Sequence, residues 1–242
     1  MEKLLLATIT DDKVKGYTQY TLPLLKSFAK KLGADFLNLD HKPEPEHQGH
    51  GMWNYKTMVF YELLDKYDRI LYLDSDIVIN KNCPNIFDTV PEDTVGLVFE
   101  DKGSRCKERL GRINGIKKEF GGNEHWVSGF LNGGFYVVSR LHKDIFTKIN
   151  DKLWDGAGFD GSHYCYQIFK HGFKHVDLGY KFNHMSMFSE PWNGKANRFD
   201  SHIIHYAGGG KFPDKGKRSR EQLIKDDIIK IYGHLVKEGE DV

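Results

Sequence analysis

Hydrophobic and polar positions along the N-terminal third of the chain follow two different periods. Leu4–Ile9 and Arg69–Leu73 are short, almost continuous apolar runs, as expected of strands buried on both faces of a sheet. Asp35–Leu39 alternates apolar and polar residues and predicts a third strand. Between these runs, Tyr17–Leu32 and Trp53–Tyr67 carry apolar residues at helical spacing. This order predicts an α/β, Rossmann-like fold with a mostly parallel central sheet flanked by helices.

The remainder of the chain predicts shorter elements. The segment His41–Gly51 is a loop by its composition of proline, glycine and charged residues. We see no internal repeat and no linker, so we expect a single domain over residues 1–242. The later pattern predicts strands at Val95–Phe99, Phe135–Val138, Lys174–Leu178 and His202–Tyr206, and helices at Arg140–Leu153 and His163–Lys170.

Two segments have a distinctive distribution of charged and apolar residues. Residues 101–122 are rich in lysine and arginine and hold few large apolar residues, which predicts either a mobile lid or binding loop or a solvated surface excursion. Residues 220–238 carry isoleucines and a leucine at helical spacing and predict an amphipathic C-terminal helix. We expect this helix to dock on the domain. Peripheral membrane contact, aided by the basic stretch KGKRSR, is the alternative.

Composition and charge exclude several classes of protein. Hydrophobic content of 39% with 13% aromatic residues suffices for a packed core and argues against global disorder. Thirty-five lysines and arginines against 34 acids leave a net charge of +1, so we expect no nucleic-acid partner. The three widely spaced cysteines form neither a disulfide framework nor a zinc motif. The N-terminal apolar run is too short for a signal peptide, and no stretch approaches the ~20 apolar residues of a membrane span. We therefore predict a cytoplasmic location.

The stretch DRILYLDSDIVIN is the most informative part of the chain. Asp74 and Asp76 follow the apolar strand Arg69–Leu73 and precede a second apolar run. Residues two apart on an extended chain point to the same side, and ligands of open α/β sheets bind where strands end. Two adjacent carboxylates repel each other unless a cation lies between them, and Mn²⁺ or Mg²⁺ suits oxygen ligands. Such an ion also neutralises a diphosphate leaving group.

The D-x-D motif has two competing interpretations. An isolated D-x-D is more often a solvated turn, although here buried strand residues stand on both sides of it. A hydrophobic strand followed by D-x-D-x-V also begins haloacid-dehalogenase-type phosphatases, in which the first aspartate is a nucleophile. Those enzymes need a later acidic pair at another strand end, and the late pair here, Asp226-Asp227, falls in the C-terminal helix. We therefore disfavour the phosphatase.

Three further features follow in order along the chain. Asn132, Gly133 and Gly134 precede a strand, where glycines allow close approach of the backbone to a ligand, although a plain turn uses the same residues. Asp160 stands just ahead of a helix, where it is either an N-cap or first-turn acid or a catalytic one. His205 ends an apolar strand and could complete a metal site of mixed ligands, or be a structural histidine. The glycines and Lys211 that follow suit phosphate oxygens.

Together these motifs resemble a known family. The helix with W-x-x-K, then YDRILYLDSDIVI, LNGGFYVVSR and HIIHYAGGGK, are similar to the glycogenin-like (family 8) glycosyltransferases of GT-A fold from about Leu4 to Lys211. The chain departs from the family in Asp160-Gly161, where members usually have Asp-Gln, and in KFP, where they have KPW.

The resemblance implies roles for particular residues. It implies Mn²⁺ (or Mg²⁺) bound by Asp74, Asp76 and His205, and a nucleotide half at residues 1–100 joined to an acceptor and metal half at residues 123–211. The catalytic residues would be Asp160, Asp76 and Asn132, with Tyr17 a candidate to stack on the base and Lys211 on the diphosphate. The donor-binding set it implies is Thr8, Thr10, Tyr17, Lys56, Asp74, Ser75, Gly133, Gly134, Gly208 and Lys211.

The function that follows is transfer of a hexose-type sugar from a nucleoside diphosphate sugar to a hydroxyl acceptor. The resemblance favours a UDP-sugar as donor and retention of anomeric configuration, and a glycan, glycoprotein or glycolipid as acceptor. An inverting enzyme would instead need a carboxylate base, for which Asp160 is the first candidate. Two alternatives are a metal-dependent phosphatase or nucleotide-sugar hydrolase, and a catalytically silent nucleotide-sugar binding protein.

Overall fold

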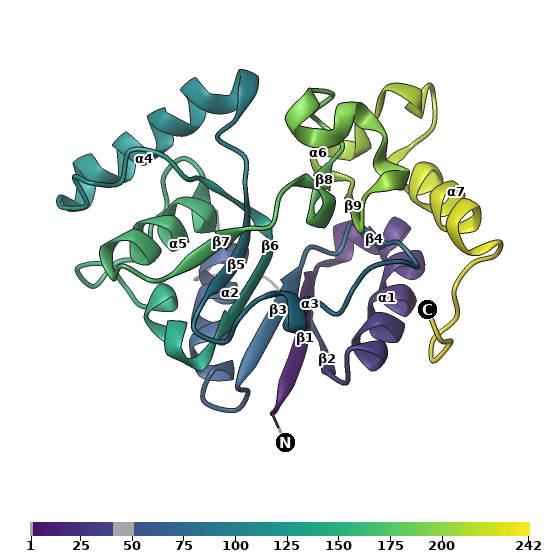
Figure 1. Ribbon diagram of the computed structural model, residues 1–242, viewed down its shortest axis with the longest axis horizontal. Helices are drawn as coiled ribbons and strands as arrows, with labels where there is room; N and C mark the ends of the chain where they lie inside the picture. Colours follow the sequence, from purple (N-terminus) through teal and green to yellow (C-terminus); the bar gives the residue numbers. More distant parts are fainter. Residues whose placement is uncertain (1, 41–50) are drawn as a thin grey trace.

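A six-stranded sheet forms the centre of the molecule (Figure 1). The computed structural model describes residues 2–40 and 51–242, so the predicted loop His41–Gly51 lies outside the described residues except for Gly51. The spatial order is β2–β1–β3–β6–β5–β7, and β6 alone runs antiparallel to the others. The predicted α/β class with a mostly parallel sheet is confirmed. The strands are β1 Leu4–Thr10, β2 Asp35–Asp40, β3 Arg69–Leu73, β5 Val95–Phe99, β6 Leu131–Ser139 and β7 His175–Asp177.

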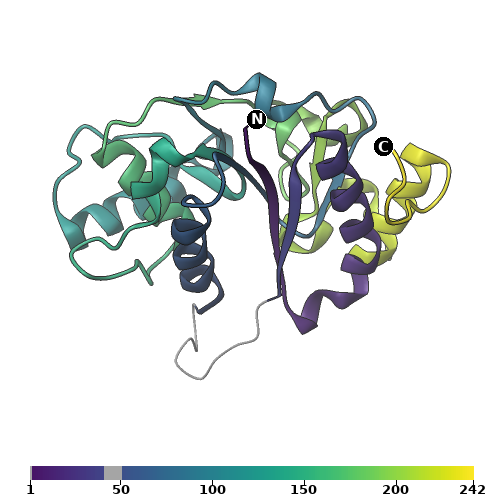
Figure 2. The ribbon, with the colours of Figure 1, turned by 90° about the horizontal axis from the view of Figure 1, so that it is seen from below.

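Helices cover both faces of this sheet, as the continuous apolar runs of β1 and β3 require. Alternate residues of β1 enter two separate cores: Leu5 packs in the cluster that contains Phe60, and Leu6 in the cluster that contains Leu24. Phe60 belongs to α2 (Gly51–Leu63) and Leu24 to α1 (Lys15–Lys31). Figure 2 shows these two helices on opposite sides of the strands.

A second, three-stranded sheet lies beyond the end of β3. It has the order β4–β9–β8, with strands β4 (Ile77–Ile79), β9 (Ile203–His205) and β8 (His184–Met185). The strand β4 pairs antiparallel with β9, and His205 lies opposite Ile77 in that register. Residues more than a hundred positions apart in sequence therefore meet directly after the Asp74–Asp76 turn.

Short helical segments connect these strands. The α-helical ones are α3 (Ile86–Thr89) and α6 (Ala207–Gly210), and the 3₁₀ segments are η1 (Asp12–Val14), η5 (Tyr180–Phe182), η6 (Pro191–Ala196), η7 (Arg198–Asp200) and η8 (Pro213–Lys215).

The segment predicted as a loop at residues 101–122 is mostly helical. It contains η3 (Gly103–Arg105) and α4 (Cys106–Phe120), so the expectation of an irregular loop or surface excursion is wrong. Two glycines and few apolar residues make this a weak helix by intrinsic propensity. Ile113 and Ile116, one helical turn apart, are buried in the same core as α2, and this packing stabilises the helix.

Other element boundaries also differ from the predicted ones. The expected helix Arg140–Leu153 is a 3₁₀ segment, η4 (Arg140–Phe146), followed by irregular chain. Ser139 caps η4 through a reciprocal pair of hydrogen bonds with His142. The next helix, α5 (Phe159–Lys170), starts earlier than expected and therefore takes Asp160 into its first turn.

The C-terminal helix α7 (Arg220–Tyr232) docks on the domain, as expected. Ile224 and Ile228 are fully buried in the core that contains α1. Gly233, with a φ of 86°, ends the helix before the predicted boundary at residue 238. In the residues that the structure describes, no helix combines the length and the apolar character required to cross a bilayer.

Candidate active site

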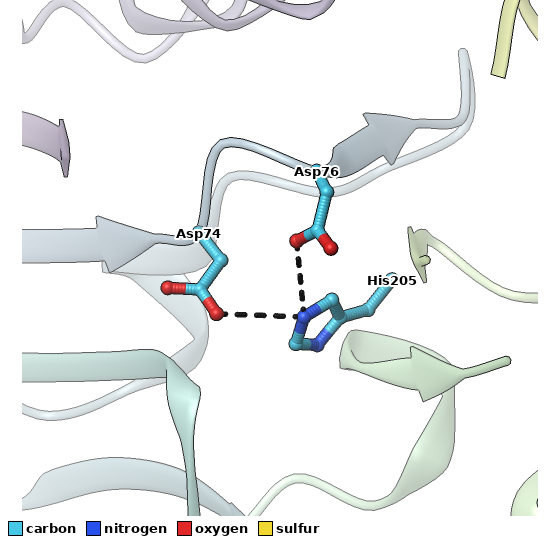
Figure 3. Close-up of side chains that lie close together, drawn as sticks. All are labelled: Asp74, Asp76 and His205. Atoms are coloured by element: carbon cyan, nitrogen blue, oxygen red, sulfur yellow. Dashed lines mark ion pairs between the residues drawn. The ribbon is translucent and has the colours of Figure 1, made fainter. Parts of the chain in front are cut away.

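The two aspartates of the D-x-D motif lie in a turn between β3 and β4 (Figure 3). Backbone hydrogen bonds hold both ends of this turn: the Asp74 amide donates to the carbonyl of Gly134 at 2.9 Å, and the Tyr206 amide donates to the carbonyl of Asp76 at 2.9 Å. The carboxylates point to a common centre, although the chain turns here instead of continuing the extended strand that the sequence predicts.

His205 completes this centre from the end of β9. Its Nε2 lies 3.5 Å from Asp74 Oδ2 and 3.2 Å from Asp76 Oδ1 (Figure 3). The candidate ligand atoms of the three residues lie within 4.8 Å of one another. Within residues 2–40 and 51–242, these are the acids and histidine that the fold gathers into a possible metal site.

The imidazole of His205 is oriented by a residue that sequence analysis did not identify. Asn183, fully buried, accepts a hydrogen bond from His205 Nδ1 at 2.8 Å, which leaves Nε2 to face the two aspartates. Burial alone would lower the pKa of His205, but Asp76 and Asp74 outweigh burial and raise it to about 10. The pKa of Asp74 falls to about 2, because His205 and Lys56 outweigh the opposing effect of burial.

The residues present fit a hard divalent cation. Two carboxylates and one imidazole are a suitable ligand set, and a cation would replace the positive charge that the imidazolium now supplies between the acids. Gly134 leaves room for this arrangement, since a Cβ there would lie 2.5 Å from His205 Cε1 and 2.6 Å from Asp74 Oδ2. The hydroxyl of Tyr72 donates to Asp74 Oδ1 at 2.7 Å and fixes that carboxylate from behind.

A cavity of about 480 Å³ opens beside the three ligands. Of the residues predicted for the site, Thr8 and Lys211 alone do not line it. Thr8 is fully buried within β1, and Lys211 is exposed, with its backbone amide donating to Ser186 Oγ. The predicted residues that line the cavity are Thr10, Tyr17, Lys56, Asp74, Ser75, Asp76, Asn132, Gly133, Gly134, Asp160, His205 and Gly208.

A buried ion pair forms one wall of this cavity. Lys56 Nζ contacts Asp160 Oδ2, with the side chains 3% and 8% exposed, and lies 4.0 Å from the centre of the Tyr72 ring. Burial raises the pKa of Asp160, and Lys56 offsets part of that effect. A Cβ on Gly133 would be 3.1 Å from Asp160 Oδ1, so the glycine backbone and the carboxylate lie close together. Asp160 thus lies in the first turn of α5 and faces the cavity, while Gly158 holds the N-cap position.

Tyr17, the candidate to stack on a base, lies against an arginine. The guanidinium of Arg220, the first residue of α7, is 4.3 Å from the centre of the Tyr17 ring, and its Nη1 donates to Asp76 Oδ2 at 2.8 Å. Burial, followed by the charge of Asp76, raises the pKa of Tyr17 to about 12. The ring face beneath Arg220 is therefore occupied in this arrangement.

Comparison with known proteins adds to this geometry. A model of the glycosyl transferase family 8 domain matches residues 3–155, well over half of the 242 residues. The chain belongs to glycosyltransferase family 8. This family 8 member has no significant match among curated proteins.

Solved structures support the GT-A fold of this family 8 glycosyltransferase. A glycosyltransferase involved in glycosylation of the major capsid of PBCV-1 superposes with a TM-score of 0.60 at 16% identity, over 93% of this chain and 99% of the other. The bifunctional glycosyltransferase WbbM gives 0.58 at 14% identity, over 96% of this chain and 50% of its own. The galactosyltransferase LgtC, solved with donor and acceptor sugar analogs, gives 0.52 at 16%, over 94% and 96%.

Several residues around the site of this glycosyltransferase were not among the sequence candidates. Arg220 and Asn183 carry no local signal, because each reaches the site only through the packing of distant elements. Three arginines of the α4 segment also line the cavity; the basic composition of residues 101–122 was the local signal for Arg105, Arg109 and Arg112.

Proposed function

We propose that this glycosyltransferase transfers a hexose-type sugar from a UDP-sugar to a hydroxyl group of a carbohydrate-containing acceptor, with Mn²⁺ or Mg²⁺ bound by Asp74, Asp76 and His205. We further propose that anomeric configuration is retained, in line with the family 8 resemblance of the motifs. The convergence of these three side chains on the rim of one cavity is the single observation that carries the proposal.

Different residues of the chain would hold the cation and contact the diphosphate of the donor. When bound, the cation would supply a Lewis acid that offsets the charge developing on the departing diphosphate. Asn183 would hold His205 in the tautomer that presents Nε2 to the centre. Gly208, at a φ of 61° and on the cavity wall, gives diphosphate oxygens close access to the backbone.

Two residues beside the reacting sugar would act through their fixed positions. Asn132 is held by three hydrogen bonds: its Oδ1 accepts from the Gly134 amide and from Asn183, and its Nδ2 donates to Glu100. Lys56 compensates the buried charge of Asp160 and holds that carboxylate next to Gly133. A carboxylate there suits an oxocarbenium-like sugar, whose positive charge it would stabilise.

The late acidic pair considered for the phosphatase alternative, Asp226-Asp227, does not lie at the site. Asp227 is buried in an ion pair with Arg198, and neither Asp226 nor Asp227 lines the cavity. A silent binding protein differs from the proposed enzyme in turnover alone, so an activity measurement distinguishes the two.

The test is a panel of nucleoside diphosphate sugars, each examined for thermal stabilisation and for release of the nucleotide, with and without Mn²⁺. We expect one donor to stabilise the protein and to be turned over only with the metal. Asp76→Asn should lower kcat/KM at least about a hundredfold, because it removes both a ligand and a charge.

Asp144→Asn is the matched control, because Asp144 is exposed on η4 and does not line the cavity. Turnover that survives Asp76→Asn or a chelator would refute the metal role. Release of inorganic phosphate from simple esters would favour the phosphatase, and donor binding with no turnover would favour the silent binder.

A further inference from the structure

Three arginines project from the α4 segment into the cavity. Arg105 ends η3 and precedes α4, which contains Arg109 and Arg112. Their spacing of four and three residues places them on one side of this helical segment, and all three line the cavity. The side chains of Arg105 and Arg112 are 27% and 26% exposed, and that of Arg109 is 4% exposed. None of the three arginines of this arginine face belongs to the candidate metal ligands Asp74, Asp76 and His205.

The arginine face holds more positive than negative charge. Glu108 contacts all three guanidinium groups at 2.6 to 2.7 Å, and Glu100 contacts Arg109 at 2.5 Å. Three guanidinium groups and two carboxylates leave one positive charge unmatched. Among the described residues of the cavity wall, Lys56 is already paired with Asp160, and His205 with Asp74 and Asp76.

The arginine face also has unused hydrogen-bond donors. The Nε atoms of Arg105 and Arg109 are buried and have no hydrogen-bond partner among the described residues. A buried donor without a partner is unfavourable, and an anion that turned either guanidinium toward the cavity would satisfy it. The guanidinium groups of Arg109 and Arg112 lie 5.4 and 5.6 Å from the centre of the Phe130 ring, which supports them from below.

The position of the arginine face in the cavity points to the acceptor. In Figure 1, α4 lies at the upper left and α6 at the upper right, above the strands of the central sheet. Residues of both helices line the cavity. Gly208 belongs to α6, and His205 lies just before it, whereas the arginines belong to η3 and α4. Asn132 lies between the two ends, because it bonds both Glu100, the partner of Arg109, and Asn183, the partner of His205.

We propose that the arginine face binds an anionic group of the acceptor, a carboxylate or a phosphate attached to the sugar that receives the transferred residue. This inference rests on the proposed sugar transfer. The planar guanidinium presents paired N–H groups that match the oxygens of either anion, which a lysine cluster would not do. The hydroxyls of a neutral sugar could accept hydrogen bonds from these donors, but they would leave the positive charge unmatched.

The experiment measures binding of matched acceptor probes by calorimetry, with UDP and Mn²⁺ present. The probes are methyl glucoside and methyl galactoside, the corresponding methyl uronosides and the corresponding 6-phosphates. We expect at least one anionic probe to bind about tenfold or more tightly than its neutral counterpart, as a charge-assisted hydrogen bond allows. The uronosides and the phosphates distinguish the two sources of the anion.

The variant Arg105→Gln/Arg112→Gln should lose this preference, while Lys107→Gln should keep it. Lys107 is exposed on the same helix and does not line the cavity, so it controls for the loss of positive charge alone. The partial exposure of both arginines lets glutamine replace them without a buried defect, and a thermal melt checks this.

Three results would overturn the inference. The first is that no anionic probe binds more than about threefold more tightly than its neutral counterpart. The second is that the preference for the anionic probe persists in the double arginine variant, and the third is that it disappears equally in Lys107→Gln. A double variant that weakens binding of the nucleotide sugar instead would assign the arginines to the donor and would also overturn it. Metal-dependent donor turnover is measured separately, so a failure of the proposed function is seen independently of these binding results.

Discussion

Replacement of Arg220 by methionine is expected to tighten binding of Mn²⁺ to the protein in the absence of donor. Arg220 Nη1 donates to Asp76 Oδ2 at 2.8 Å and thus occupies a carboxylate that the cation would use. A cation at the site must therefore compete with the guanidinium for Asp76, and it experiences the repulsion of that fixed positive charge. Methionine has a similar length and can pack on the Tyr17 ring without a charge.

The magnitude follows from the exposure of this ion pair. The Arg220 side chain is 31% exposed, so the ion pair with Asp76 is worth about 1 kcal/mol at most. Repulsion between a divalent cation and a guanidinium about 5 Å away is roughly 1.7 kcal/mol in water without salt, and screening at physiological ionic strength reduces it to roughly 1 kcal/mol. A total of about 1–2 kcal/mol corresponds to a roughly 5- to 30-fold lower dissociation constant for Mn²⁺.

Isothermal titration of Mn²⁺ into the metal-free protein measures this change. Lys217→Met is the control, because Lys217 is an exposed cation in the same basic stretch. A melting temperature close to that of the wild type would show that α7 stays docked in the Arg220 variant. An unchanged or weaker affinity for Mn²⁺ in a folded Arg220→Met protein would refute the idea that Arg220 competes with the cation.

Three further predictions concern the site and the stability of the fold. Gly134→Ala should weaken Mn²⁺ binding about tenfold or more in the same titration, because a Cβ there meets two metal ligands, whereas Gly111→Ala, with open space around it, should not. Asp227→Asn should lower the free energy of unfolding in urea by about 3 kcal/mol, since it leaves the buried guanidinium of Arg198 poorly compensated; a loss below about 1 kcal/mol would contradict this. Burial lowers the pKa of His163 from 6.5 to about 4, so the unfolded chain binds more protons between these values, and unfolding free energy should fall by about 3 kcal/mol as pH drops from about 6.5 to 4. His163→Gln should reduce that pH dependence, and an unchanged slope would show that His163 is not responsible.

Local patterns were sufficient for the class of fold and for the centre of the site. The apolar run before Asp74 forms a strand whose side chains are buried on both faces, and the apolar residue types of the run predict that burial. The acids after this strand can bind a cation through their own carboxylates. The glycines after Asn132 have no side chain and so allow close approach of the backbone. The structure places these residues around one cavity: the acids follow β3, and Asn132, Gly133 and Gly134 lie within β6, not ahead of the strand as predicted.

Intrinsic propensity was misleading where packing decides the conformation. The α4 segment holds glycines and many charges, but two isoleucines one turn apart enter the core and make the segment helical. This packing also turns the basic residues of the segment into an ordered arginine face. The sequence contains those arginines without indicating that they share a cavity with the aspartates.

The sequence by itself therefore determined the α/β sheet, the D-x-D motif at the end of β3 and the ligand types, because each depends on neighbours within a few positions. Only the tertiary structure decided that Asn183 orients His205, that Arg220 contacts Asp76 and that Lys56 is paired with Asp160. These contacts join residues from separate strands and helices. They exist because α5 packs against α2 and β6, and α7 packs against α1 and β4. This packing sets the distances that decide ligand geometry and charge compensation.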